Sequence, residues 1–125
     1  MGKFSFGKKE KLCSQLVIEQ LFANGQSFKV FPLRVIVLPV DKAEANAQIL
    51  ISVPKKRVRS SPGRNRIKRL IRETYRLNKF ELVEKWQQEE KYFAIGFIYL
   101  TDKAPDYTAL NVAMKEVIRK LVELH

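Results

Sequence analysis

Apolar residues recur at helical spacing near both ends of the chain. In residues 12–24, Val17 and Leu21 fall on one side of a helix, and Gly25 follows as a typical stop. Near the other end, Asp106 can cap a helix. Its apolar stripe consists of Leu110, Ala113, Met114, Val117, Leu121 and Leu124. The pattern therefore predicts a first and a last helix.

Three segments between these helices have the composition of β-strands. Residues 27–40 are rich in β-branched and aromatic side chains and apolar on both faces, which is typical of a buried strand, while Pro32 and Pro39 indicate an edge or irregular ends. Residues 48–53 place Ile49, Ile51 and Val53 on one face, and residues 92–100 form a third apolar run. We expect three strands from these segments.

A further helix is predicted over 61–80, with Ser61 as its cap and Pro62 at its first position. At about 100° per residue, one face of this helix is basic. That face holds Asn65, Lys68, Arg69, Arg72, Arg76 and Lys79, and Arg66 lies at its far border. The opposite face holds Ile67, Leu70, Ile71, Thr74 and Leu77 and can pack on a sheet.

The predicted order is helix, strands, helix, strand, helix. This order indicates an α+β fold, a small sandwich of helices on a mostly antiparallel sheet. A length of 125 residues suits one domain, 1–125, with a basic N-terminal tail over about residues 1–10. We expect a cytoplasmic protein, because no apolar stretch approaches the roughly 20 residues of a membrane span and no signal-peptide pattern is present.

The charge of the chain is concentrated in one segment. Lys and Arg number 24 against 13 Asp and Glu, a formal net charge of +11. Residues 55–79 hold eleven basic residues and one acid, Glu73, whereas the other hundred residues hold 13 basic and 12 acidic groups. A local excess of this size indicates a polyanionic partner.

Two other interpretations of the basic helix are less favoured. A solvated surface helix usually interleaves acids at i,i+4 to relieve repulsion, and only Glu73 is present. A membrane-surface helix needs its apolar face for lipid, but the flanking strands need that face for a core. Arg also outnumbers Lys in this helix, and its planar fork suits phosphate.

Few residues suit catalysis or metal binding. Cys13 is the only cysteine, so it cannot form an internal disulfide, and we expect an inert buried thiol. His125 is the only histidine, which leaves no His/Cys cluster for zinc. A two-metal nuclease needs clustered carboxylates, but Glu73 stands alone in the basic segment and Glu89 and Glu90 lie on a predicted polar linker. The sequence predicts no catalytic residue.

The segment RNRIKRLIRE at 64–73, preceded by ISVPKK at 51–56, resembles the signature of the protein subunit of bacterial ribonuclease P. The segment IEQLFANGQS at 18–27 is similar to the family's first helix and the turn after it. In that family the basic helix contacts the catalytic RNA subunit. The residues that we assign to RNA binding are Lys55, Lys56, Arg57, Arg59, Arg64, Asn65, Arg66, Lys68, Arg69 and Arg72. Residues 57–63 depart from the usual family pattern, so the resemblance does not fix the shape of this loop.

The resemblance also implies a fold detail and a mechanism. It implies a left-handed βαβ crossover, and an RNA subunit that uses Mg²⁺ to remove the 5′ leader of precursor tRNA while the protein binds that leader. The leader would lie in a cleft between the first helix and the sheet, where we place Ile18, Phe22 and Ile36, although Ile18 and Ile36 fit a plain core equally well. The expected partners are therefore the RNA subunit and the leader, with no membrane and no obligate protein partner.

Two alternatives remain from the residues alone. A ribosomal or other structural RNA-binding protein would show the same basic helix without a role in cleavage. A DNA-binding regulator would need a recognition helix, and no helix-turn-helix spacing precedes Arg64.

Overall fold

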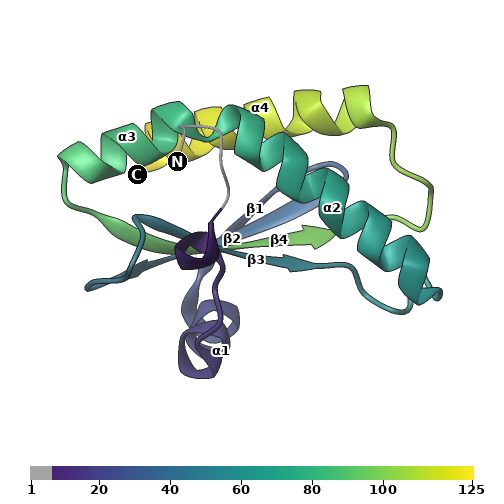
Figure 1. The fold of residues 1–125 in the computed structure, drawn as a ribbon, viewed down its shortest axis with the longest axis horizontal. Coiled ribbons are helices and arrows are strands. Elements are labelled where there is room, and N and C mark those ends of the chain that lie inside the picture. Colours follow the sequence, from purple (N-terminus) through teal and green to yellow (C-terminus); the bar gives the residue numbers. More distant parts are fainter. Residues whose placement is uncertain (1–6) are drawn as a thin grey trace.

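The computed structural model describes residues 7–125, which form four strands, four α-helices and a short 3-10 helix (Figure 1). In chain order the elements are η1 (Lys8–Glu10), α1 (Gln15–Asn24), β1 (Gln26–Val30), β2 (Leu33–Val40), β3 (Ala47–Ser52), α2 (Ser61–Asn78), α3 (Phe80–Gln88), β4 (Tyr92–Tyr99) and α4 (Tyr107–Leu124).

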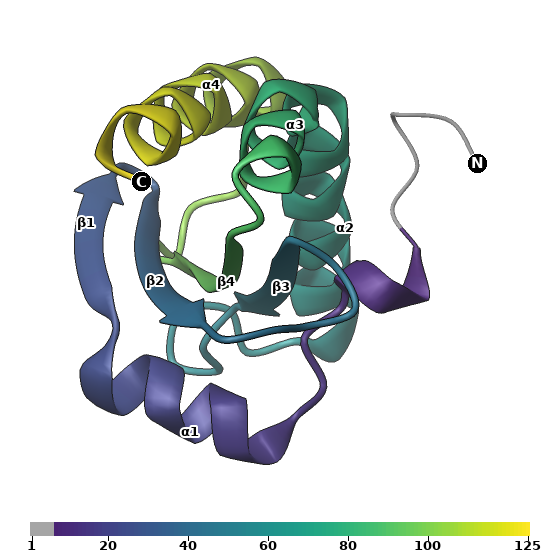
Figure 2. The same cartoon turned by 90° about the vertical axis from the view of Figure 1, so that its left-hand side faces the viewer.

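The four strands form one sheet in the order β1-β2-β4-β3. The pairs β1/β2 and β2/β4 are antiparallel, and β3/β4 is parallel. The helices α2, α3 and α4 lie on one face of the sheet and α1 lies on the other (Figure 2). The predicted α+β class with a mostly antiparallel sheet is confirmed.

The connection between the two parallel strands is left-handed. In Figure 1, β3 and β4 both run to the right, and α2 and α3 lie above them. Figure 2 views the molecule from the left of Figure 1 and shows that β3 lies nearer to the viewer of Figure 1 than β4. The chain rises from β3 in front, returns above the sheet through α2 and α3, and descends to β4 behind. This path is a left-handed turn. Nearly all such crossovers are right-handed, so this feature agrees with the resemblance and departs from the general rule.

The prediction of one strand over 27–40 is wrong. The chain reverses at Phe31 and Pro32, so that Val30 pairs with Leu33 in a hairpin of β1 and β2. Proline lacks the N–H that a strand donates to its neighbour and sets φ for a turn, which explains the break at this position.

Several predicted helix boundaries also shift. The cap of α2 is Ser60 rather than Ser61, and its Oγ accepts a hydrogen bond from the Gly63 N–H at 3.1 Å. The predicted helix is interrupted at Lys79, and a separate helix, α3, continues to Gln88, beyond the predicted end at residue 80. The first helix begins at Gln15, which leaves Cys13 outside it and exposed, so the prediction of a buried thiol is wrong. The last helix begins as predicted, with Asp106 as its cap.

Side chains on the two faces of the sheet form two apolar cores. The larger core lies under α2, α3 and α4 and contains buried residues such as Ile71, Tyr75, Trp86 and Phe97. The smaller core lies under α1 and contains Leu12, Leu21, Ile36 and Ala94. Leu124, which the sequence predicts to complete the apolar stripe of α4, is exposed, whereas Leu121 one turn earlier is buried.

Gly25 lets α1 sit close to the sheet. A Cβ atom at this position would lie 2.5 Å from the Cγ2 atom of Ile36 and 2.5 Å from the backbone oxygen of Leu21. Both distances are far below van der Waals contact, so a side chain here would push the helix away from β2. The glycine after α1 is therefore required by close packing.

The segment before α1 is fastened to the rest of the protein at three points. The Leu12 N–H donates to the Ile49 carbonyl at 2.9 Å, and the Gln48 side chain donates to the Lys9 carbonyl at 3.0 Å. The third point is an ion pair between Glu10 and Lys79, whose side chains are both largely buried. These contacts hold residues 9–12 between the edge of β3 and the joint of α2 and α3.

Replacement of Lys79 by Met should lower the free energy of unfolding by about 3 kcal/mol, because the largely buried Glu10 carboxylate loses this cationic partner. The double variant Glu10→Gln/Lys79→Met removes the charge as well as its partner and should be less destabilised than Lys79→Met alone. Urea unfolding followed by circular dichroism measures both differences. Equal losses in the two variants would show that the unpaired Glu10 carboxylate is not the cause of the loss in Lys79→Met.

Candidate nucleic-acid interface

The orientation of α2 is set by its buried residues. Ile67, Ile71, Thr74 and Tyr75 are buried against the sheet and the other helices. Because these positions recur on one side of the helix, the positions between them face outward. Asn65, Arg66, Arg69 and Arg72 are exposed, and Lys68 is partly exposed. The basic face that the sequence predicts is therefore present on the surface.

Arg64 holds the loop that leads into α2. One guanidinium nitrogen, Nη1, donates to the Val58 carbonyl at 3.1 Å and to the Arg59 carbonyl at 2.7 Å. Gly63 lies close to the same loop, since a Cβ there would be 2.7 Å from the Ser60 Oγ and 3.0 Å from the Val58 Cγ1. The residue that the sequence assigns to RNA contact thus has a structural task as well, because it positions residues 58–60.

The loop itself carries the other predicted basic residues. Lys55, Lys56, Arg57 and Arg59 are all exposed. The N–H groups of Arg57 and Val58 donate to the Pro54 carbonyl at 3.0 and 3.2 Å, which folds the chain directly after β3. The structure therefore brings these four cations next to the first turn of α2.

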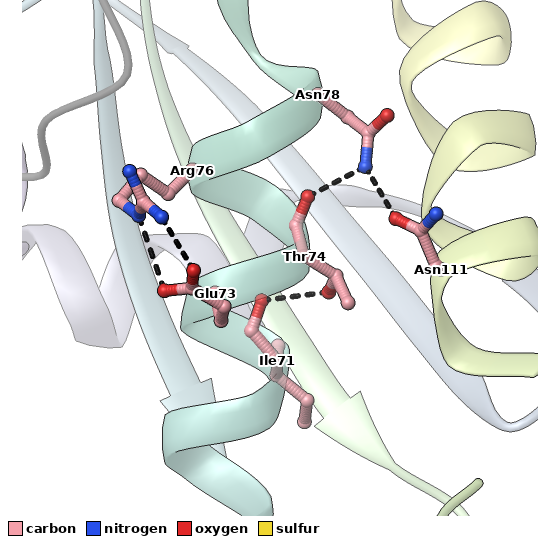
Figure 3. A network of polar contacts seen from close by, with 6 residues as sticks. All are labelled: Ile71, Glu73, Thr74, Arg76, Asn78 and Asn111. Atoms are coloured by element: carbon pink, nitrogen blue, oxygen red, sulfur yellow. Dashed lines mark hydrogen bonds and ion pairs between the residues drawn. The ribbon is translucent and has the colours of Figure 1, made fainter. Parts of the chain in front are cut away.

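Two cations on the predicted basic face are engaged within the protein. Arg76 donates from Nε to Glu73 at 3.1 Å and from Nη2 to the other oxygen of the same carboxylate (Figure 3). The hydrogen bonds from Arg76 lower the pKa of Glu73, so the carboxylate stays ionised and offsets one positive charge. Lys79 is buried and paired with Glu10. The part of α2 without an acidic residue is therefore its first half.

The second half of α2 is joined to α4 by polar contacts. Figure 3 shows the Asn78 side chain between the two helices, where its Nδ2 donates to the Thr74 carbonyl at 2.7 Å and to Oδ1 of Asn111 at 2.8 Å. The buried Thr74 hydroxyl donates to the Ile71 carbonyl at 2.9 Å. These bonds satisfy the polar groups at this contact and fix this end of α2.

A groove connects the basic face to the other side of the sheet. It is a cavity of about 240 Å³ lined by Lys11, Leu12, Ile49, Leu50, Ile51, Lys68 and Arg72. Two of these residues, Leu12 and Leu50, also belong to the apolar cluster under α1. The groove therefore combines an apolar floor on β3 with cations from α2 and from the segment before α1.

The three predicted cleft residues lie in different environments. Ile18 and Phe22 are one turn apart on α1, with Ile18 partly buried and Phe22 50% exposed. Ile36 is only 6% exposed and lies in the core between α1 and the sheet. Phe22 is thus the member of this set with a ring on the surface, while Ile36 supports α1 from below.

Sequence reasoning missed Lys11 and Leu50. Lys11 lies far from the basic segment in sequence, and Leu50 is one of several apolar residues in its strand. Only the contact of residues 9–12 with β3 brings Lys11 beside Lys68 and Arg72. No local pattern could have found this arrangement.

Residues 7–125 show neither a metal-binding cluster nor a membrane-spanning helix. No group of three or more His, Cys, Asp or Glu residues is placed to hold a metal ion in this part of the chain. No helix among the described residues has the length and apolar character needed to cross a membrane. The features of this surface are positive charge, exposed apolar side chains and a groove.

Comparison with known proteins gives one consistent result. Residues 6–122 match the family model described as Ribonuclease P. The chain is 41% identical over 118 residues to the ribonuclease P protein component of Porphyromonas gingivalis, which covers 93% of this chain and 86% of that protein. It is 40% identical over 79 residues to the component of Dictyoglomus thermophilum, with 63% of each chain covered.

The fold agrees with a solved structure of lower sequence similarity. The RNase P protein of Staphylococcus aureus aligns with a TM-score of 0.59 and 18% identity, covering 94% of this chain and 95% of that one. At this identity the likeness supports the fold, and the sequence matches support the family. The chain therefore belongs to the ribonuclease P protein family, the protein component of a ribonucleoprotein endoribonuclease that processes tRNA.

Proposed function

We propose that this protein binds the RNA subunit of ribonuclease P through the first half of α2 and the loop before it, and binds the 5′ leader of precursor tRNA beside α1. The observation that carries the proposal is the exposed row of Arg66, Arg69 and Arg72, which has no acidic residue among its neighbours on α2 until Glu73. The four exposed cations of residues 55–59 extend this row.

Phosphate binding explains the chemistry of this surface. Arg side chains bind phosphate oxygens through paired N–H groups, and several such contacts on one face release counterions from RNA. A positive surface of this density repels itself unless a polyanion neutralises it. Repulsion among these cations therefore lowers the stability of the fold, and a role in binding RNA explains why they are present.

The groove beside β3 supports a path for a single RNA strand. Lys11 and Lys68 would contact phosphates of this strand, while Leu50 offers an apolar surface. Phe22 on α1 exposes an aromatic ring on which an unpaired base can stack, and Ile18 lies one turn before it. Single-stranded RNA binds to such combinations of cations and exposed aromatic rings, and the leader is single-stranded.

The cleavage step is assigned to the RNA subunit with its Mg²⁺. The proposed surface contains cations, amides and apolar groups, none of which activates water for attack on a phosphodiester. Positive charge beside the bound leader instead strengthens the binding of substrate. The protein would thus raise the rate at low Mg²⁺, where RNA–RNA repulsion is screened least.

The first test is 5′ cleavage of a precursor tRNA by a bacterial ribonuclease P RNA at low Mg²⁺, with and without this protein. We expect stimulation that requires the RNA, and no cleavage by the protein alone. Tight RNA binding without stimulation would favour the alternative of a structural RNA-binding protein.

Removal of single cations should change the salt dependence of RNA binding. Arg66→Ala, Arg69→Ala and Arg72→Ala should each weaken binding to the RNA subunit and reduce the slope of log K against log salt by about 1 per lost phosphate contact. Lys115→Ala is the matched control, because Lys115 is an exposed cation on α4 outside this surface. Filter binding at several salt concentrations gives the slopes. Slopes equal to that of the unmodified protein would contradict the assignment of α2.

Phe22→Ala should reduce the preference for leader-bearing over leaderless tRNA by roughly five-fold or more, the effect of losing one stacked base. The variant should fold normally because the ring is half exposed. Ile36→Val provides the comparison, since it alters the core beneath α1 without reaching the surface. Equal losses of affinity for both tRNA forms in Phe22→Ala would show that Phe22 does not bind the leader.

A further inference from the structure

A second apolar site lies at the end of the molecule where α2 and α4 begin (Figure 1). It is a cavity of about 240 Å³ lined mainly by the β1–β2 turn, the end of β4, the loop between β4 and α4, and the first turn of α4. Its lining includes Phe31, Pro32, Tyr99, Lys103, Pro105 and Leu110. None of these residues belongs to the surface proposed above.

The cavity has a buried floor and an exposed aromatic rim. Tyr99 and Leu110 are each about 1% exposed and lie at its base. The Tyr99 hydroxyl already donates to the Lys103 carbonyl at 2.7 Å, so it is satisfied within the protein. Phe31 is 71% exposed, more than any other large hydrophobic residue of the described chain. A phenyl ring held at the edge of an apolar cavity is suited to stack on a flat ligand.

The cavity lies next to the start of the basic surface. A neighbouring cavity of about 190 Å³ shares Lys103, Ala104 and Pro105 with it and is also lined by Val58 and Arg66. Val58 belongs to the basic loop that Arg64 holds, and Arg66 to the exposed row of α2. Residues 103–105 of the β4–α4 loop therefore line both the cavity beside Phe31 and the cavity beside Arg66.

The charges around the two cavities favour an anionic chain. Lys103 borders both cavities and Arg66 borders one, and residues 55–59 add four cations beside Val58. The acids nearby are Asp102 and Asp106, and Asp106 caps α4 by accepting from the Thr108 N–H at 3.3 Å. The surroundings are thus positive overall, which suits a ligand that joins a flat apolar group to phosphates.

We propose that the cavity beside Phe31 takes one unpaired base of the same RNA whose phosphates contact Arg66 and the loop at residues 55–59. The inference rests on the proposed function, because it extends the RNA surface by one base-binding site. Its volume fits a single ring system rather than a larger ligand, since pockets for drug-sized molecules start near roughly 300 Å³. Stacking on Phe31 is tolerant of sequence, so the site anchors the RNA without selecting one base.

Fluorescence of Phe31→Trp tests stacking directly. Trp86, the natural tryptophan, is fully buried and gives a background that an external base does not contact. We expect the emission of Phe31→Trp to be quenched as ribonuclease P RNA is added, with saturation at the concentration where filter binding saturates. Leu124→Trp is the control, because Leu124 is similarly exposed, at 65%, but lies at the other end of α4. RNA binding without quenching specific to Phe31→Trp would overturn the site and leave the proposed function intact.

Affinity measurements give an independent readout. Phe31→Ala should weaken RNA binding roughly five- to a hundred-fold with an unchanged salt slope, because no charge is removed. Ala109→Leu should act in the same direction by filling the cavity from α4. Both positions are exposed, so thermal unfolding should match that of the unmodified protein. Unchanged affinity in both variants would refute the base site, and failure of the unmodified protein to bind the RNA would refute the proposed function and this site together.

Discussion

The packing of α2 on the sheet determines where its basic residues lie. Ile67, Ile71 and Tyr75 are buried in the larger core, and their burial fixes the rotation of the helix about its axis. Each buried side chain of this size contributes roughly 1.5–3 kcal/mol, which exceeds the repulsion among exposed cations. The basic residues therefore face outward as a consequence of the core, and no contact among the cations themselves is needed to arrange them.

The left-handed crossover determines which part of the sheet α2 covers. It places α2 over the β3 edge of the sheet, on the same side as the segment that leads into α1 (Figure 2). Residues 9–12 contact the outer edge of β3 and cover it. This contact brings Lys11 close to the cations Lys68 and Arg72 of α2. Topology thus joins the helical layer to the face that carries α1, and the groove lined by Lys11 and Arg72 is the result.

The sequence predicts those parts of the structure that depend on local periodicity. The two faces of α2 follow from a repeat of 3.6 residues, and Asp106 caps α4 as its side chain suggests. The turn at Phe31 and Pro32 interrupts a run that looks continuous in the sequence. Apolar residues continue on both sides of the turn, although the two sides form separate strands, β1 and β2. The positions of Arg64 and Lys79 depend on contacts with the loop at 58–59 and with Glu10, which no helical wheel contains. Local pattern therefore finds the basic helix but not the division of its cations between structure and surface.

Arg64 binds its loop through main-chain carbonyls and not through side chains. A carbonyl oxygen is present whatever residue occupies positions 58 and 59, so the bond does not depend on their identity. The path of this backbone therefore does not depend on the charges that its side chains carry. Substitutions can exchange cations along residues 55–59 while the loop keeps its shape. At Gly63 few substitutions fit, because a Cβ would crowd Ser60 and Val58. This separation lets one backbone carry different patterns of charge.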